Sequence, residues 1–141
     1  MNNNNIKYEL QRILQGKSYV SYGKPIQAIA SYLRKSQETS ALASGSKQNK
    51  AEETEELIKY INQHHLWNCD VDFNNFLSAG AEQRVYIHNN NKVYKLNDSI
   101  YYLSWVDYLN NLLLNNYFFP DTAYNLIGFY KSDDNVVYAL V

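Results

Sequence analysis

The sequence predicts an α+β fold, with a helical first third followed by an antiparallel β-sheet that has one helix inserted between its strands. Apolar residues in the first third recur every three or four positions, which is helical spacing. From Asp70 onward they occur in short runs of strand length, separated by turns rich in Asn and Asp. We therefore divide the 141-residue chain into a helical extension, residues 1–66, and a sheet domain, residues 67–141.

Three helices are expected in the extension, over residues 6–16, 25–35 and 52–65. Each has apolar residues on one face, and Pro25 suits the first turn of the second helix. Glutamates open the third helix, where they complement the positive end of the helix dipole. Residues 37–51 are rich in Ser, Ala, Lys and Gln, so we expect a flexible loop there.

The sheet domain is expected to contain four strands and one helix, preceded by a short segment, residues 73–77, that also pairs. The strands are predicted at residues 81–88, 92–96, 124–130 and 136–141, and the helix at residues 103–116. Three consecutive asparagines join the first two strands, and asparagine tolerates the positive φ of a tight turn. Pro120 prevents the helix from continuing.

This order of elements, β-loop-β-β-α-β-β, is that of the N-terminal lobe of a protein kinase. Such a lobe carries a glycine-rich loop over the phosphates of ATP and a lysine on its third strand. When the valine of G-x-G-x-x-G-x-V is placed on Val85, only the middle glycine is kept, as Gly80. Ser78 and Gln83 replace the other two glycines. Gly80 would let the loop backbone approach the phosphates.

The segment Val93-Tyr94-Lys95 matches the V-A-I-K strand of kinases. Val93 and Lys95 are two positions apart on a strand and so share a face. Val93 is expected to cover an adenine ring while Lys95 reaches the phosphates, and Val85 would complete the same surface. The alternative is that Lys95 is an ordinary solvated strand lysine. The order of the surrounding elements favours the nucleotide site.

A kinase lysine is held by a carboxylate from the helix that follows its strand. That helix contains no glutamate here, and Asp107 is its one acid. Glu82, in the loop beside Gly80, is the rival partner for Lys95. A solvated Asp107 with no such role is the third alternative, and all three remain open at this point.

Three segments resemble a known family: KPIQAIASYLRKS, GAEQRVYI followed by VYKLND, and the long segment that begins SIYYLSWVDYLNN. Over residues 24–141 they are similar to the kinase-like domain of the polyvalent proteins of phages and conjugative elements. Members tend to have W-E-D-Y where this chain has Trp105-Val106-Asp107-Tyr108. The resemblance implies a serine/threonine kinase-like, ATP-binding lobe from a mobile genetic element, with Asp107 as the better candidate for the helix carboxylate.

The motifs that carry kinase chemistry do not occur in this sequence. It contains neither H-R-D-x-x-x-x-N nor D-F-G, which supply the catalytic base and the metal-binding aspartate. We therefore assign no catalytic residue in this chain, and expect weak ATP binding without turnover, with Mg²⁺ only as part of the nucleotide complex. A fragment, a split kinase and a non-enzymatic interaction or regulatory protein that uses the lobe as a scaffold remain alternatives.

Composition and charge limit the partners. The net charge is −1, and the basic residues of the first third are attributed to a solvated face, so a nucleic-acid partner is not expected. No apolar run approaches the roughly 20 residues of a membrane span, and a lone Cys69 fits the cytoplasm. Cys69, His64 and His65 offer too few ligands for a metal site. The apolar segment 136–141 is expected to be exposed and to associate with a C-terminal kinase lobe or with a second copy.

Overall fold

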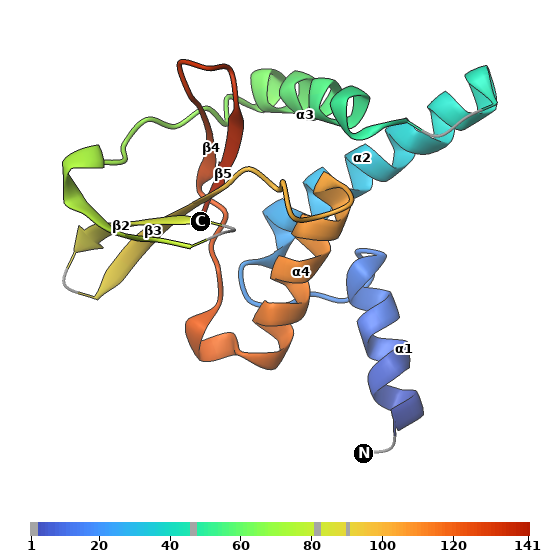
Figure 1. The fold of residues 1–141 in the computed structure, drawn as a ribbon. Coiled ribbons are helices and arrows are strands. Elements are labelled where there is room, and N and C mark those ends of the chain that lie inside the picture. Colours follow the sequence, from blue (N-terminus) through green and yellow to red (C-terminus); the bar gives the residue numbers. More distant parts are fainter. Residues whose placement is uncertain (1–2, 46–47, 81–82, 90) are drawn as a thin grey trace.

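The computed structural model describes residues 3–45, 48–80, 83–89 and 91–141. Four α-helices and a five-stranded antiparallel sheet make up the described chain, which confirms the predicted α+β class. The first three helices precede the sheet in sequence, and the fourth is inserted between its strands. Figure 1 shows the helices gathered on one side of the molecule and the strands on the other.

The helical extension consists of α1 (Asn3–Leu14), α2 (Gly23–Ser44) and α3 (Lys50–His64). The predicted loop is wrong where it overlaps α2, because the helix continues to Ser44. Its Ser, Ala, Gln and Glu residues are compatible with a helix even without an apolar face. Gly45, with φ of 76°, then ends α2 by donating its N–H to the carbonyl of Ala41. No helix in the described ranges is long and apolar enough to cross a membrane.

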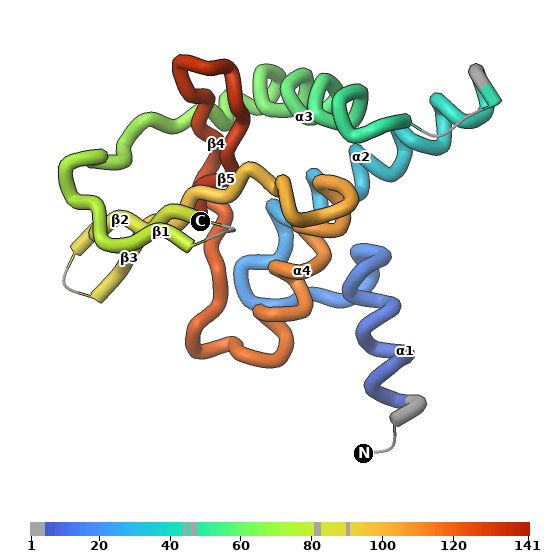
Figure 2. Tube along the Cα trace, in the orientation of Figure 1, coloured from blue at the N-terminus to red at the C-terminus, as the bar shows by residue number. Residues whose placement is uncertain are grey.

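The sheet has the strand order β1-β2-β3-β5-β4, and every neighbouring pair is antiparallel. Its strands are β1 (Phe76–Ala79), β2 (Arg84–Asn89), β3 (Lys92–Asn97), β4 (Gly128–Lys131) and β5 (Val137–Leu140). The helix α4 (Trp105–Phe118) connects β3 to β4 in sequence. The tube in Figure 2 follows this path from the yellow β3 through the orange α4 to the red β5.

The sheet carries a different core on each face. One face packs against the helices, where Trp105 of α4 meets Phe129 of β4 with ring centroids 6.2 Å apart. The other face carries a smaller aromatic cluster that includes Tyr86 and Tyr130. Phe73 covers this cluster, with ring centroids 5.2 Å from Tyr86 and 5.1 Å from Tyr130. The segment that precedes β1 is therefore held in place by aromatic contacts on the face opposite α4.

The expectation of an exposed, apolar last strand is wrong. β5 lies between β3 and β4, so it is not an edge of the sheet. Ala139 and Leu140 are fully buried, and Val141 is 7% exposed. The reason is that the two faces of β5 join the two cores described above, so the strand is covered by the chain itself. The predicted association loses the exposed strand on which it was based, and the partner itself stays a prediction.

Candidate functional site

The register of the sheet places four residues in one row across the strands. Ser78 of β1 is paired with Val85 of β2, and Val85 with Lys95 of β3. Lys95 in turn exchanges two backbone hydrogen bonds with Val141, at 2.8 and 3.0 Å. Paired residues in antiparallel strands project from the same face. Lys95 therefore lies between Val85 and Val141 on the face that α4 partly covers.

A second pair on the same face widens this surface. Ile87 is paired with Val93, one step along the strands from Val85 and Lys95. Ile87 is 42% exposed and Val93 is 40% exposed, while Val85 and Lys95 are half-buried. The predicted residues Val85, Val93 and Lys95 thus do share one face, as an open apolar surface with a single cation. Such a surface offers apolar contact to a flat ring and one positive charge to an anion beside it.

The side chain of Lys95 is held by a tyrosine. Its Nζ donates to the hydroxyl of Tyr124 over 3.2 Å and lies 4.8 Å from the centroid of the Tyr124 ring. Within the described ranges, no ion pair joins Lys95 to Asp107. Glu82 lies outside the described residues. Tyr124 is thus the observed partner of Lys95, and sequence reasoning did not identify it.

Asp107 occupies the first turn of α4 and is exposed. The helix begins there because the Ser104 side chain accepts a hydrogen bond from the Asp107 N–H over 3.0 Å, which is an N-cap. Burial raises the pKa of the Glu53 carboxyl, and the charge of Asp107 adds to this rise. The role of Asp107 as a partner of Lys95 stays a prediction.

Gly80 lies in the turn that joins β1 to β2. Its N–H donates to the carbonyl of Gln83 over 2.9 Å, which closes the turn. A Cβ added at Gly80 would meet nothing within 4 Å, and its backbone does not adopt positive φ. Neither packing nor backbone conformation within the described chain requires a glycine here. As far as the described residues go, the space in front of Gly80 is therefore open.

Asn116 of α4 fixes the position of Tyr124. Its amide nitrogen donates to the carbonyls of Tyr124 and Ser21, both at 2.9 Å, and its oxygen accepts from the Tyr124 N–H at 2.7 Å. Asn116 is 1% exposed. These bonds use both backbone groups of Tyr124, so Tyr124 does not join the sheet, and β4 begins at Gly128, later than predicted. The sequence signal that could have identified Asn116 is its polar side chain in the leucine-rich helix α4.

Glu53 of α3 holds the start of α4. Its carboxylate accepts from the N–H groups of Trp105 at 2.5 Å and Val106 at 3.4 Å, and from Gln37 Nε2 at 2.8 Å. Glu53 is 1% exposed, and this burial raises its pKa above the ordinary value of a glutamate despite the bonds it accepts. The sequence offered no way to distinguish Glu53 from the other glutamates of the acidic cluster.

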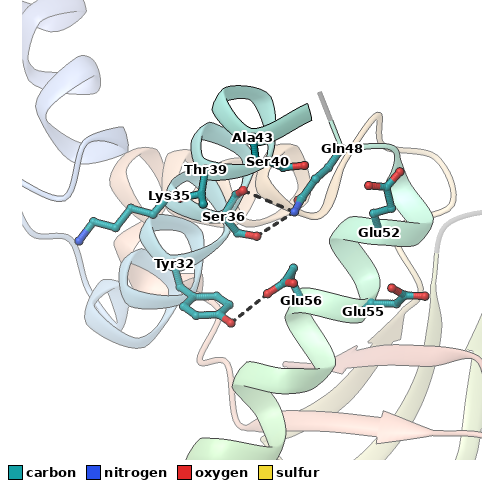
Figure 3. Close-up of a pocket in the computed structure, with 10 residues that line it drawn as sticks. All are labelled: Tyr32, Lys35, Ser36, Thr39, Ser40, Ala43, Gln48, Glu52, Glu55 and Glu56. Atoms are coloured by element: carbon teal, nitrogen blue, oxygen red, sulfur yellow. Dashed lines mark hydrogen bonds between the residues drawn. The ribbon is translucent and has the colours of Figure 1, made fainter. Parts of the chain in front are cut away.

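A pocket of about 630 Å³ lies between α2 and α3, and neither Lys95 nor Gly80 lines it (Figure 3). It is lined by Glu52, Glu55 and Glu56, and a hydrogen bond of 3.2 Å from the Tyr32 hydroxyl to Glu56 crosses it. Three carboxylates would repel the phosphates of a nucleotide. This pocket is larger than the one of about 260 Å³ beside Gly80, but its three carboxylates outnumber the one lysine that lines it and make it unsuitable for an anionic ligand.

A family described as a serine/threonine/tyrosine kinase found in polyvalent proteins matches residues 50–141. The matched part contains α3, α4 and all five strands, and α1 and α2 lie outside it. Curated proteins and solved structures give no match.

Proposed function

Because the chain belongs to the family of serine/threonine/tyrosine kinases found in polyvalent proteins, we propose that its sheet binds ATP on the face that carries Lys95. The observation that supports this most strongly is the pairing of Val85 with Lys95, next to the pairing of Ile87 with Val93. It combines an open apolar surface and a single cation in one place, which is what a purine ring joined to a triphosphate needs.

Each residue has a distinct part in this proposal. Val85 and Val93 cover the adenine ring, and Lys95 binds the phosphates. Gly80 allows the backbone of the β1–β2 turn to approach the same phosphates without a Cβ in the way. Mg²⁺ arrives with the nucleotide, since it is usually held by phosphate oxygens and water together with few protein ligands.

We expect the chain by itself to bind ATP without transferring its phosphate. Phosphoryl transfer depends on a positioned metal and a base for the attacking hydroxyl. The sequence lacks the H-R-D and D-F-G motifs that provide them in kinases. A C-terminal kinase lobe, on the same or another polypeptide of a phage or conjugative element, is the partner that would complete the site.

The test is a titration of Mg-ATP followed by thermal unfolding. A ligand that binds the folded state raises the melting temperature. We expect this rise in the wild type and in Lys92→Met, which removes an exposed lysine from the same strand. It should be lost in Lys95→Met. Absence of any shift in the wild type up to millimolar ATP would overturn the proposal.

The second candidate is an interaction module that kept the lobe as a scaffold. The exposure of Ile87 and Val93 favours it, because an open apolar surface also suits a protein partner. The same titration separates the two functions. A scaffold would bind a partner lobe equally well with Lys95→Met and would show no response to ATP.

A further inference from the structure

We propose that Tyr124, rather than a helix carboxylate, is the residue that positions Lys95 for the nucleotide, and that Asn116 in turn fixes Tyr124. This inference rests on the proposed ATP site. It goes beyond that site by naming two residues that act through Lys95 and do not themselves contact the phosphates. Three half-buried or buried side chains make the contacts that link these residues: Lys95, Tyr124 and Asn116.

Tyr124 holds the ammonium group of Lys95 without neutralising it. The ammonium group carries three N–H donors, and the bond to the Tyr124 hydroxyl uses one of them. The other two stay available for phosphate oxygens. The face of the Tyr124 ring adds a cation–π contact at 4.8 Å, which narrows the positions that the flexible lysine side chain can take. A carboxylate would hold the lysine more strongly but would cancel its charge.

The buried side of α4 favours a phenol, not a carboxylate, as the partner of Lys95. Tyr108 of α4 is 3% exposed. Tyr124 packs against the same core as Tyr108, and burial, together with the neighbouring Tyr102 and Tyr124, raises the pKa of Tyr108. Asp107 is the next residue along the helix but is exposed on another side. Lys95 bonds to a neutral phenol and, within the described ranges, forms no ion pair.

Asn116 connects this arrangement to the helical extension. It bonds both backbone groups of Tyr124 and also the carbonyl of Ser21, in the segment before α2. Since Asn116 is 1% exposed, water does not compete for these bonds. The base of the Tyr124 side chain is therefore fixed by α4 and by a part of the chain outside the family match.

The first measurement requires no nucleotide. Lysines of the ATP-free protein are labelled briefly with an acylating reagent and quantified by mass spectrometry. We expect Tyr124→Phe to raise the labelling rate of Lys95 by about threefold, because its hydrogen bond is lost, and to leave Lys92 unchanged. An unchanged ratio of Lys95 to Lys92 labelling overturns the inference.

The second measurement is the affinity for Mg-ATP. We expect Tyr124→Phe to weaken binding by about threefold to tenfold. Tyr94→Phe is the matched control, because Tyr94 precedes Lys95 on β3 and projects from the opposite face. Asn116→Asp should also weaken binding. If Asn116→Asp folds poorly, Tyr124→Phe still provides the test.

The outcomes distinguish this inference from the proposed function. A wild type that binds Mg-ATP with unchanged affinity after Tyr124→Phe overturns the role of Tyr124 and leaves the ATP site intact. A wild type that does not bind Mg-ATP overturns the ATP site, and with it the use of Tyr124 for the nucleotide. Faster Lys95 labelling together with weaker ATP binding supports both.

Discussion

The two halves of the sheet have the same backbone pairing but differ in what covers them. On the side of β4 and β5, Phe129 and Ala139 are fully buried against the helices. On the side of β1 and β2, every residue of β1 is exposed, and Ile87 is 42% exposed. The difference arises because α4 covers only one half. The packed half should determine stability, and the open half should determine binding.

The largest expected effect is in the packed half. Phe129→Ala should lower the free energy of unfolding by about 3–5 kcal/mol, because it removes a fully buried ring and leaves a cavity. Ile87→Ala in the open half should cost less than about 1 kcal/mol, since its side chain is already partly in water. Urea denaturation of both variants measures the difference. Equal losses of unfolding free energy in the two variants would show that the open half contributes as much to stability as the packed half.

Two glycines provide an intermediate comparison. A Cβ at Gly128 would lie 2.5 Å from the backbone oxygen of Leu66, so Gly128→Ala should cost about 1–3 kcal/mol. A Cβ at Gly80 meets nothing within 4 Å, so Gly80→Ala should change stability by less than about 0.5 kcal/mol. The Gly80 variant should nevertheless bind Mg-ATP more weakly. Unaltered ATP affinity in Gly80→Ala would count against a phosphate contact at this turn.

A smaller effect than that of Phe129→Ala is expected for Glu53, which anchors α4 to α3. Glu53→Ala should cost about 1–2 kcal/mol, because the buried N–H of Trp105 loses its acceptor. Glu53→Gln keeps an acceptor and should cost less.

Because the pKa of Glu53 is raised in the folded protein, the folded state retains its proton to higher pH than the unfolded state does. The stability of the wild type relative to Glu53→Gln should therefore fall as pH rises from the ordinary glutamate pKa through the raised one. Unfolding curves at several pH values measure this, and a relative stability that grew with pH would contradict it.

The elements were largely predictable because they depend on local signals. Three signals each span only a few residues: the apolar spacing of the helices, Gly16 after α1, and the asparagines between β2 and β3. The same holds for the shared face of Val93 and Lys95, which follows from strand alternation. The extension of α2 to Ser44 was missed because a segment without an apolar face gives no periodic signal, although its residues tolerate a helix.

The partners within the site were not predictable, because they depend on tertiary contacts. Asp107 was favoured as an acid in the correct helix; it lies exposed in the first turn of α4, and its role as a partner of Lys95 stays a prediction. Tyr124 reaches Lys95 from a position 29 residues later in the chain. The burial of β5 was misjudged for a similar reason, since its covering residues come from helices distant in sequence.

The hydrogen bond between Asn116 and Ser21 joins residues 95 positions apart. A growing chain leaves the ribosome from its N-terminus, so α1 and α2 emerge well before the helix that covers them. The core shared by α4 and the last two strands also buries Ile13, Ile26 and Leu33. These residues of the first two helices lack those neighbours until α4 and both strands have been synthesised. We therefore expect the first two helices to reach their final positions late in folding, because contacts of such long range form slowly.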